Sequence, residues 1–438
     1  MVKVRKVPYY TMEYSLFRGK IWKEYYGSIG AVPINTPQKI SYDRPAPGTA
    51  PAPKVQPPKP TPEQIKQQQL EAARQRALSE QIKKQQKETP KPETKPKVLE
   101  AEEQEKLPEF DLLDIPAAMD KIGWPISAEM ARRWFAGPSH VYNNQPNSLQ
   151  PLDDTAITLN WILKYGNTKK RLDELLGEKI YSSAALDRVK EKVLKRLKSV
   201  FQSSNSTSPL LSFNTAQFLG DIRQFHIDWQ FQLNEVSAFD TLDGLLMTDL
   251  TGALGSFNIY AAIGIVRVSG ERYYRYDKIP NEFCCDPIVE VTHVYLYAKD
   301  NYSFNDKKDS TKSQYLGHWN KIGMILSYTA AASDLVGSDL IKMGRDKIVQ
   351  NNFNWDYMIK NDEIDKPVDI RKGMFSKLIS REVYFPVYNS SYNEWREKHK
   401  RGEDFMVYSK PKLYKLKKPI SFKLDTLCRP YETTSSGH

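Results

Sequence analysis

The sequence predicts an α+β protein in which a helical lobe is followed by a curved or barrel-like antiparallel β lobe, with a disordered Pro/Gln-rich tether before both. Three observations predict this class. Pro and Gln crowd into residues 44–108 and disfavour a packed core there. Apolar residues recur at helical spacing up to about residue 203, and they alternate as in strands after the Ser-rich stretch 203–211.

These changes in composition set the expected domain boundaries. We expect an aromatic N-terminal docking segment (1–43), a Pro/Gln-rich linker with a marginal helix (44–108), a helical lobe (109–209), an antiparallel β-rich lobe (210–428) and a flexible tail (429–438). The aromatic segment either folds back on the main domain or becomes ordered on a partner. The sequence leaves these two alternatives open.

Capping signals and apolar spacing place the helices. Pro116 can start a first helix, and Ser127 is the expected N-cap of a second. Residues 153–166 read as a third helix, capped by Asp153 or Asp154. The clearest helix is 183–203, whose apolar residues form one face.

Period-two patterns place the strands. Residues 256–277 read as two β runs joined by a hairpin at Ser269-Gly270, and 287–300 alternate apolar and polar side chains. Residues 225–232 read as a strand with His226 and Asp228 on one face, which is either a polar outer face or an acid–base pair. Residues 313–324 fit a short helix or an irregular connector.

Charge and motifs exclude several classes of function. The net charge is +11, but residues 1–108 carry 20 Lys and Arg against 12 Asp and Glu, so the remainder is nearly balanced. That balance argues against a nucleic-acid partner. GxxxxGK[ST], HExxH, GxSxG and CxxC are all absent, and the three cysteines are expected to be buried thiols. No export signal or membrane-spanning apolar run is visible, so we expect synthesis in the cytoplasm.

The stretch 300–321, DNYSFNDKKDSTKSQYLGHWNK, is the candidate site. Asp300, Tyr302 and Asp306 follow a strand end, where loops often carry chemistry, and His318 comes shortly after. Two carboxylates there can act as acid and base or bind a divalent cation. The alternative is an exposed polar turn.

Three stretches resemble the hallmark segments of a bacterial family of unknown function, DUF6402. They are VYLYAKDNYSFND, SQYLGHWNK and YNEWREKHKRGEDFMVYSKPK, and the similarity covers about residues 112–425. Members resemble cargo of type VI secretion systems and are thought to be antibacterial effectors. The resemblance implies a secretion spike or tube protein bound through the N-terminal segment, a cognate immunity protein, and delivery without a signal peptide into a target cell, most readily its periplasm.

A second resemblance concerns the chemistry. Residues 300–304, Asp-Asn-Tyr-Ser-Phe, are similar to the Asp-x-Tyr-Asp-Phe stretch of colicin M-like bacteriocins, although Ser303 replaces the second Asp and Trp319 follows His318 where that family has Arg. The resemblance implies cleavage of a lipid-linked peptidoglycan precursor with a divalent cation such as Mg²⁺. It implies Asp300 as the main carboxylate, Asp306 in place of the missing one, Tyr302 orienting the pyrophosphate and His318 transferring protons.

Two other classes of function fit the sequence. The apolar region 239–266 suggests a membrane-active, pore-forming toxin, although aspartates interrupt it. The N-terminal aromatic residues suggest a non-enzymatic adaptor that loads other cargo onto a spike.

Overall fold

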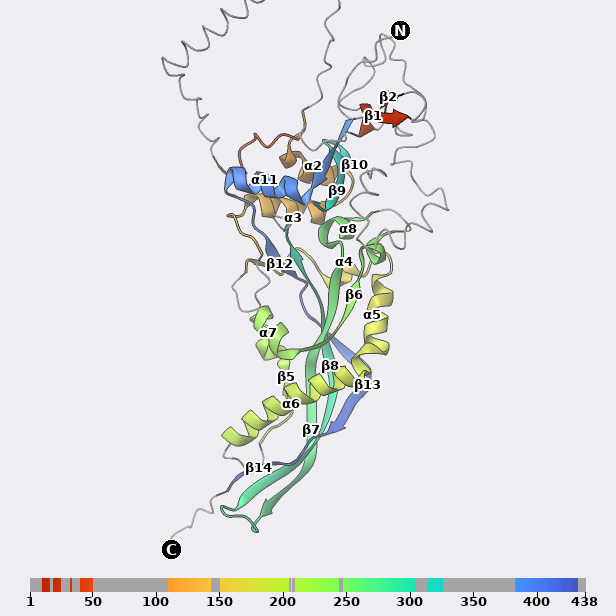
Figure 1. Cartoon of the computed structure of the whole chain (residues 1–438). Helices are drawn as coiled ribbons and strands as arrows, with labels where there is room; N and C mark the ends of the chain where they lie inside the picture. Colours follow the sequence, from red (N-terminus) through yellow and green to blue (C-terminus); the bar gives the residue numbers. More distant parts are fainter. Residues whose placement is uncertain are drawn as a thin grey trace, which may run out of the picture. The chain divides into compact units, whose positions relative to one another are not determined.

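Helices dominate the first part of the folded chain and strands the second, which confirms the α+β class (Figure 1). The computed structural model describes residues 40–49, 109–142, 150–204, 206, 209–243, 247–304, 313–325 and 383–431. It describes the backbone alone at 10–15, 19–24, 32–33, 325 and 383. The chain divides into two units, residues 1–48 with 107–438, and residues 49–106. All elements below belong to the first unit.

The helical part begins with the short η2 (Leu112–Asp114) and continues through α6. Its elements are α2 (Ile115–Lys121), α3 (Pro125–Ala136), α4 (Leu159–Ile162), α5 (Thr168–Gly177), η3 (Lys179–Tyr181) and α6 (Ser183–Ser203). The expected helix at 183–203 is confirmed. The Ser182 hydroxyl accepts from the Ala185 N–H, and every fourth residue from Ala185 to Phe201 is buried.

Two details of the helical part differ from the sequence prediction. Residues 153–166 do not form one helix, because the Asp153 carboxylate accepts from the N–H groups of Thr155 and Ala156 and holds a turn between β4 (Leu152–Asp153) and α4. Ser127 is not an N-cap. It lies inside α3, where its N–H and hydroxyl both donate to the buried Asp249 carboxylate.

A sheet of eight strands forms the second part. Its order is β4-β12-β8-β7-β5, with β13 and β14 also paired to β8, and β6 to β7. The central strands β7 (Phe257–Arg275) and β8 (Glu282–Tyr302) run side by side in Figure 1. The others are β5 (Phe213–Asn214), β6 (Gln230–Val236), β12 (Phe405–Tyr408), β13 (Lys412–Lys423) and β14 (Leu427–Pro430). The sheet is open and, apart from β4–β12, antiparallel.

Smaller elements complete the unit. A second sheet has the order β10-β9-β11-β3, and β1 pairs with β2. Their bounds are β1 (Tyr10–Ser15), β2 (Gly19–Glu24), β3 (Val32–Pro33), β9 (Tyr315–Asn320), β10 (Gly323–Ile325) and β11 (Val383–Tyr388). The remaining helices are η4 (Thr215–Phe218), α7 (Ile222–Trp229), η5 (Ala238–Thr241), α8 (Asp249–Leu254) and α11 (Asn389–His399).

Three predictions about the β-rich part are wrong. Ser269-Gly270 is not a turn, because β7 runs through it. A Cβ at Gly270 would lie 1.9 Å from the Asp286 carbonyl oxygen, so glycine here permits close approach of β8. Most of residues 225–232 belongs to α7, whose first N–H groups donate to Asp221. Residues 313–324 are neither helix nor irregular connector, since β9 and β10 form a hairpin there.

The cysteine prediction holds for one residue only. Cys285 is a buried thiol, as expected. Cys284 and Cys428 form a disulfide, because β14 brings Cys428 directly opposite Cys284 on β8. They are 144 residues apart in the sequence, so no local pattern could predict this pairing.

Residues 41–44 pack against the chain around η2. Ser41 accepts a hydrogen bond from the Leu112 N–H (3.1 Å) and donates its own N–H to the Phe110 carbonyl (2.8 Å). The Arg44 guanidinium bridges the carboxylates of Asp111 (3.3 Å) and Asp114 (2.8 Å). These contacts fix residues 41–44 at the start of the helical part.

A fully buried carboxylate joins the helical part to the sheet. Asp404 Oδ1 accepts from Trp134 Nε1 of α3 (2.9 Å), from Arg396 Nη2 of α11 and from the Phe304 N–H beyond β8 (3.3 Å). Oδ2 accepts from the Tyr142 N–H at 3.1 Å. The Arg396 side chain is itself 5% exposed and stacks over the Trp134 ring. Each buried charge is therefore paired and hydrogen-bonded.

We expect Asp404→Ala to destabilise the fold by about 3–5 kcal/mol, because Arg396 would be left as a buried unpaired charge. Denaturant unfolding of the full chain measures this as a lower midpoint. Asp425→Ala, at an exposed acidic residue, is the control and should stay within about 0.5 kcal/mol of wild type. Equal midpoints for the two variants would contradict the role of Asp404.

Candidate functional site

The structure places the predicted site residues on two sheets. Asp300 and Tyr302 lie near the end of β8, where they pair with Val407 and Phe405 of β12. His318 is on β9 of the four-stranded sheet. Asp306 lies outside the described residues. Among the described residues, neither Asp300 nor Tyr302 is hydrogen-bonded to His318.

Asp300 belongs to a polar strand end. Residues 294–298 of β8 are all buried, whereas Lys299, Asp300 and Asn301 are half-buried. The pairing of β8 with β7 ends at Lys299, opposite Asn258, while the pairing with β12 continues. The chain therefore presents three consecutive polar side chains where one neighbouring strand ends.

The protonation of Asp300 is unusual. Burial raises the pKa of its carboxyl from 3.8 to about 8, and this outweighs the opposing effects of the Asn301 N–H and the Lys299 ammonium group. Asp300 is therefore mostly protonated at neutral pH. Among the described residues Asp300 forms no salt bridge, and a half-buried carboxylic acid of this kind can donate a proton to a bound substrate.

Tyr302 is part of the aromatic packing around this strand end. Its ring stacks on Phe405 at 5.2 Å, meets Phe304 edge-on at 5.4 Å, and is 7% exposed. Burial raises the pKa of its phenol, so the hydroxyl stays neutral. The sequence analysis placed Asp300 and Tyr302 after a strand end, but both lie within β8, two residues apart and on the same face.

His318 is almost fully enclosed. Its side chain is 1% exposed, and Nδ1 lies 2.5 Å from the Tyr315 hydroxyl. The neighbouring strands β10 and β11 pair on both sides of it, opposite Ile325 and Pro386. This position gives His318 a clear packing role in the smaller sheet.

A cluster of tyrosines with His226 lies on the opposite face of β8 from Asp300. His226 Nδ1 is 2.8 Å from the Tyr297 hydroxyl, and its ring packs edge-on against Tyr260, Tyr297 and Tyr408. Burial, helped by the charges of Lys299 and Lys192, lowers the pKa of His226 to about 4. Asp228 is not its partner, because Asp228 is exposed and accepts from Gln224 of the same helix. This histidine is therefore neutral at physiological pH.

Lys299 and Asn301 extend this cluster toward the strand end. Lys299 Nζ lies 5.9 Å from the centre of the Tyr408 ring, and burial lowers its pKa. Among the described residues, no carboxylate lies within salt-bridge distance of Lys299, and the buried Asn301 Oδ1 has no hydrogen-bond partner. Sequence analysis missed both residues, although Lys299 continues the alternation of Tyr295 and Tyr297. A half-buried ammonium group of this kind suits an anionic ligand.

The described residues around Asp300 do not form a cation site. In the described part of the chain, the only group of three metal-binding side chains close enough to share an ion is Glu282, Cys284 and Cys428, at the other end of β8. Asp300 has the Lys299 ammonium group beside it and is largely protonated, and both features disfavour a divalent cation. The Mg²⁺ implied by the colicin M resemblance does not fit these residues, so we derive no step through it.

The open sheet, the helices against it and the polar end of β8 define an α+β protein with a candidate acid on its central strand. A family model described as "Family of unknown function (DUF6402)" matches residues 110–424, and the chain belongs to this family. No curated protein and no solved structure matches the chain.

We expect the stability of the wild type relative to Asp300→Asn to fall by about 1–3 kcal/mol between pH 4 and pH 8. The Asp300 pKa is higher in the folded than in the unfolded chain, so the folded state binds the proton more tightly and loses stability as the pH rises through this window. Denaturant unfolding of both proteins at several pH values measures this difference in the free energy of unfolding. The control is Asp425→Asn, which should follow the wild-type profile. Parallel profiles for wild type and Asp300→Asn would show that Asp300 has an ordinary pKa.

Proposed function

We propose that this protein is an antibacterial effector, delivered into a target bacterium by a type VI secretion system, that hydrolyses a peptidoglycan precursor in the cell envelope. The observation that carries the proposed place of action is the Cys284–Cys428 disulfide. Disulfides persist in oxidising compartments such as the bacterial periplasm and are rare in the cytoplasm. A protein stabilised by a disulfide fits action in another cell's envelope.

The polar end of β8 supports the proposed chemistry. Hydrolysis of a pyrophosphate ester needs a proton for the leaving oxygen and positive charge for the phosphoryl oxygens. Asp300 holds a proton at neutral pH. In this proposal Asp300 is the acid, and Lys299, which lies on the opposite face of the strand, belongs to the neighbouring cluster of Tyr297 and Tyr408. His318 would need to reach the substrate from the smaller sheet, so it is the weaker candidate.

The Pro/Gln-rich composition of residues 44–108 is typical of a tether and supports the proposed delivery. We propose that the N-terminal residues contact a spike or tube protein, and that an immunity protein protects the producing cell.

The pore-forming alternative has less support. The apolar region 239–266 contributes the buried residues of α8 and the centre of β7, and the Asp249 carboxylate caps the start of α3. In the part of the chain that the structure describes, no helix is long and apolar enough to cross a membrane. No observation specifically favours the adaptor.

We expect the full chain to kill a Gram-negative bacterium when it is exported to the periplasm and to be harmless when it is kept in the cytoplasm. Because Asp300 is the proposed acid, Asp300→Ala should reduce killing by about 100-fold or more. Viable counts after induction measure both effects. Cleavage of a lipid-linked precursor by the purified protein tests the substrate.

Asp425→Ala, at an exposed acidic residue, is the matched control and should kill like wild type. Matched expression and circular dichroism establish that Asp300→Ala is folded. Killing from the cytoplasm, or killing unaffected by Asp300→Ala, would refute an envelope hydrolase that uses this strand end.

A further inference from the structure

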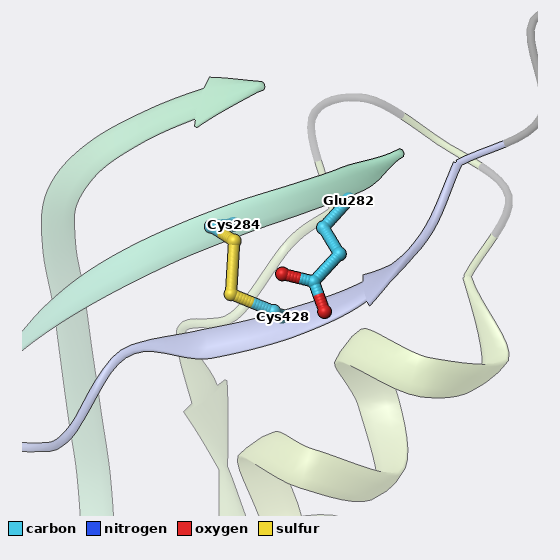
Figure 2. A group of neighbouring side chains, drawn as sticks. All are labelled: Glu282, Cys284 and Cys428. Atoms are coloured by element: carbon cyan, nitrogen blue, oxygen red, sulfur yellow. A yellow bond between two sulfur atoms is a disulfide. The ribbon is translucent and has the colours of Figure 1, made fainter. Parts of the chain in front are cut away.

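The disulfide end of β8 carries a third metal-binding side chain. Glu282 and Cys284 lie on β8, and Cys428 lies opposite Cys284 on β14. The Glu282 carboxylate points toward the two sulfur atoms (Figure 2), and one ligand atom from each of the three residues lies within 4.8 Å of the others. We propose that the reduced protein binds a zinc ion through Glu282, Cys284 and Cys428, and that formation of the disulfide releases the ion.

The ligand set suits zinc. Two thiolates and a carboxylate are ordinary zinc ligands, and a tetrahedral site with Zn–S bonds of about 2.3 Å needs the sulfur atoms about 3.8 Å apart. Opening the disulfide allows this separation within the 4.8 Å span of the three ligand atoms. Glu282 and Cys428 are half-buried, so a water molecule can reach the fourth position.

Two arginines lie beside the proposed ligands. Arg275 Nη1 lies 3.7 Å from Glu282 Oε2 and holds this carboxylate at the strand edge. The Arg429 guanidinium, next to Cys428, stacks over the Phe283 ring at 5.4 Å. The Asp286 carboxylate is engaged elsewhere, because it accepts hydrogen bonds from the hydroxyl groups of Tyr273 and Thr426.

Exchange between the zinc form and the disulfide form balances in atoms and electrons, and it needs no group from the polar end of β8. An external disulfide oxidant accepts two electrons from the Cys284 and Cys428 thiolates and is reduced to two thiolates. The Cys284–Cys428 bond forms through a mixed disulfide, and Zn²⁺ leaves with its water. A reducing cytoplasm therefore favours the zinc form, and an oxidising envelope favours the disulfide.

Both forms would hold β14 against β8. The last strand pairs with β8 over only four residues and also contacts α6. A cross-link by zinc before export, and by the disulfide after it, would keep this strand in place in both compartments. Zinc binding needs only the reduced chain and does not depend on the proposed function.

We expect the full chain, reduced with a phosphine and kept free of oxygen, to bind a single equivalent of Co²⁺ used as a spectroscopic substitute for zinc. Thiolate-to-cobalt charge-transfer bands and intense tetrahedral d–d bands should appear and should disappear when Zn²⁺ is added. The oxidised wild type should show neither. This comparison uses one sequence, so it does not depend on a variant folding.

Variants identify the ligands. Cys428→Ser should weaken Co²⁺ binding by about 100-fold or more, and Glu282→Gln by about tenfold. The matched controls are Cys285→Ser, at the adjacent buried thiol, and Glu290→Gln, at an exposed glutamate of the same strand, and both should bind like wild type. The proposal is overturned if reduced wild type binds Co²⁺ no more tightly than Cys428→Ser, if charge-transfer bands are absent, or if Cys285→Ser abolishes them.

Discussion

The buried Asp404 carboxylate is the interaction on which the arrangement of helices and sheet depends. It accepts hydrogen bonds from an indole, a guanidinium and two backbone N–H groups that come from four separate segments. A buried carboxylate is costly unless it is paired and hydrogen-bonded, so these segments can take only arrangements that keep these four bonds. Gly402 adds a second constraint, because a Cβ there would lie 2.6 Å from the Trp134 ring. The start of β12 is thereby fixed against α3.

The candidate site follows from this constraint. Asp404 immediately precedes β12, and its bond to the Phe304 N–H fixes the chain just beyond β8. The register between β12 and β8 is thus set from both sides, which places Val407 opposite Asp300. A shift of one residue would exchange the two faces of β12 and bring Tyr408 opposite Asp300. The half-buried environment that raises the pKa of Asp300 is therefore a consequence of distant packing.

Local patterns predicted the parts of the fold that depend on local physics. Helix 183–203 was predicted because its apolar stripe and Ser182 cap lie within one segment, whereas Asp300 and Tyr302 were expected after a strand that in fact continues through Tyr302. Residues 225–232 were wrongly predicted as a strand, because a short amphipathic helix and a short strand give similar patterns of aromatic and polar residues. The contacts of His226 with Tyr260 and Tyr408, and the Cys284–Cys428 bond, join segments far apart in the chain. No single-segment pattern encodes such contacts.

Strand β8 carries both the disulfide and the candidate acid, and their separation limits how they can influence each other. Cys284 and Asp300 are 16 residues apart on a continuous strand, which corresponds to about 50 Å at roughly 3.3 Å per residue. Electrostatic effects between exposed groups are screened well within that distance. The redox state of Cys284 therefore cannot tune the Asp300 pKa directly. It can act only through the stability of the sheet, because the Cys284–Cys428 bond links β14 to β8.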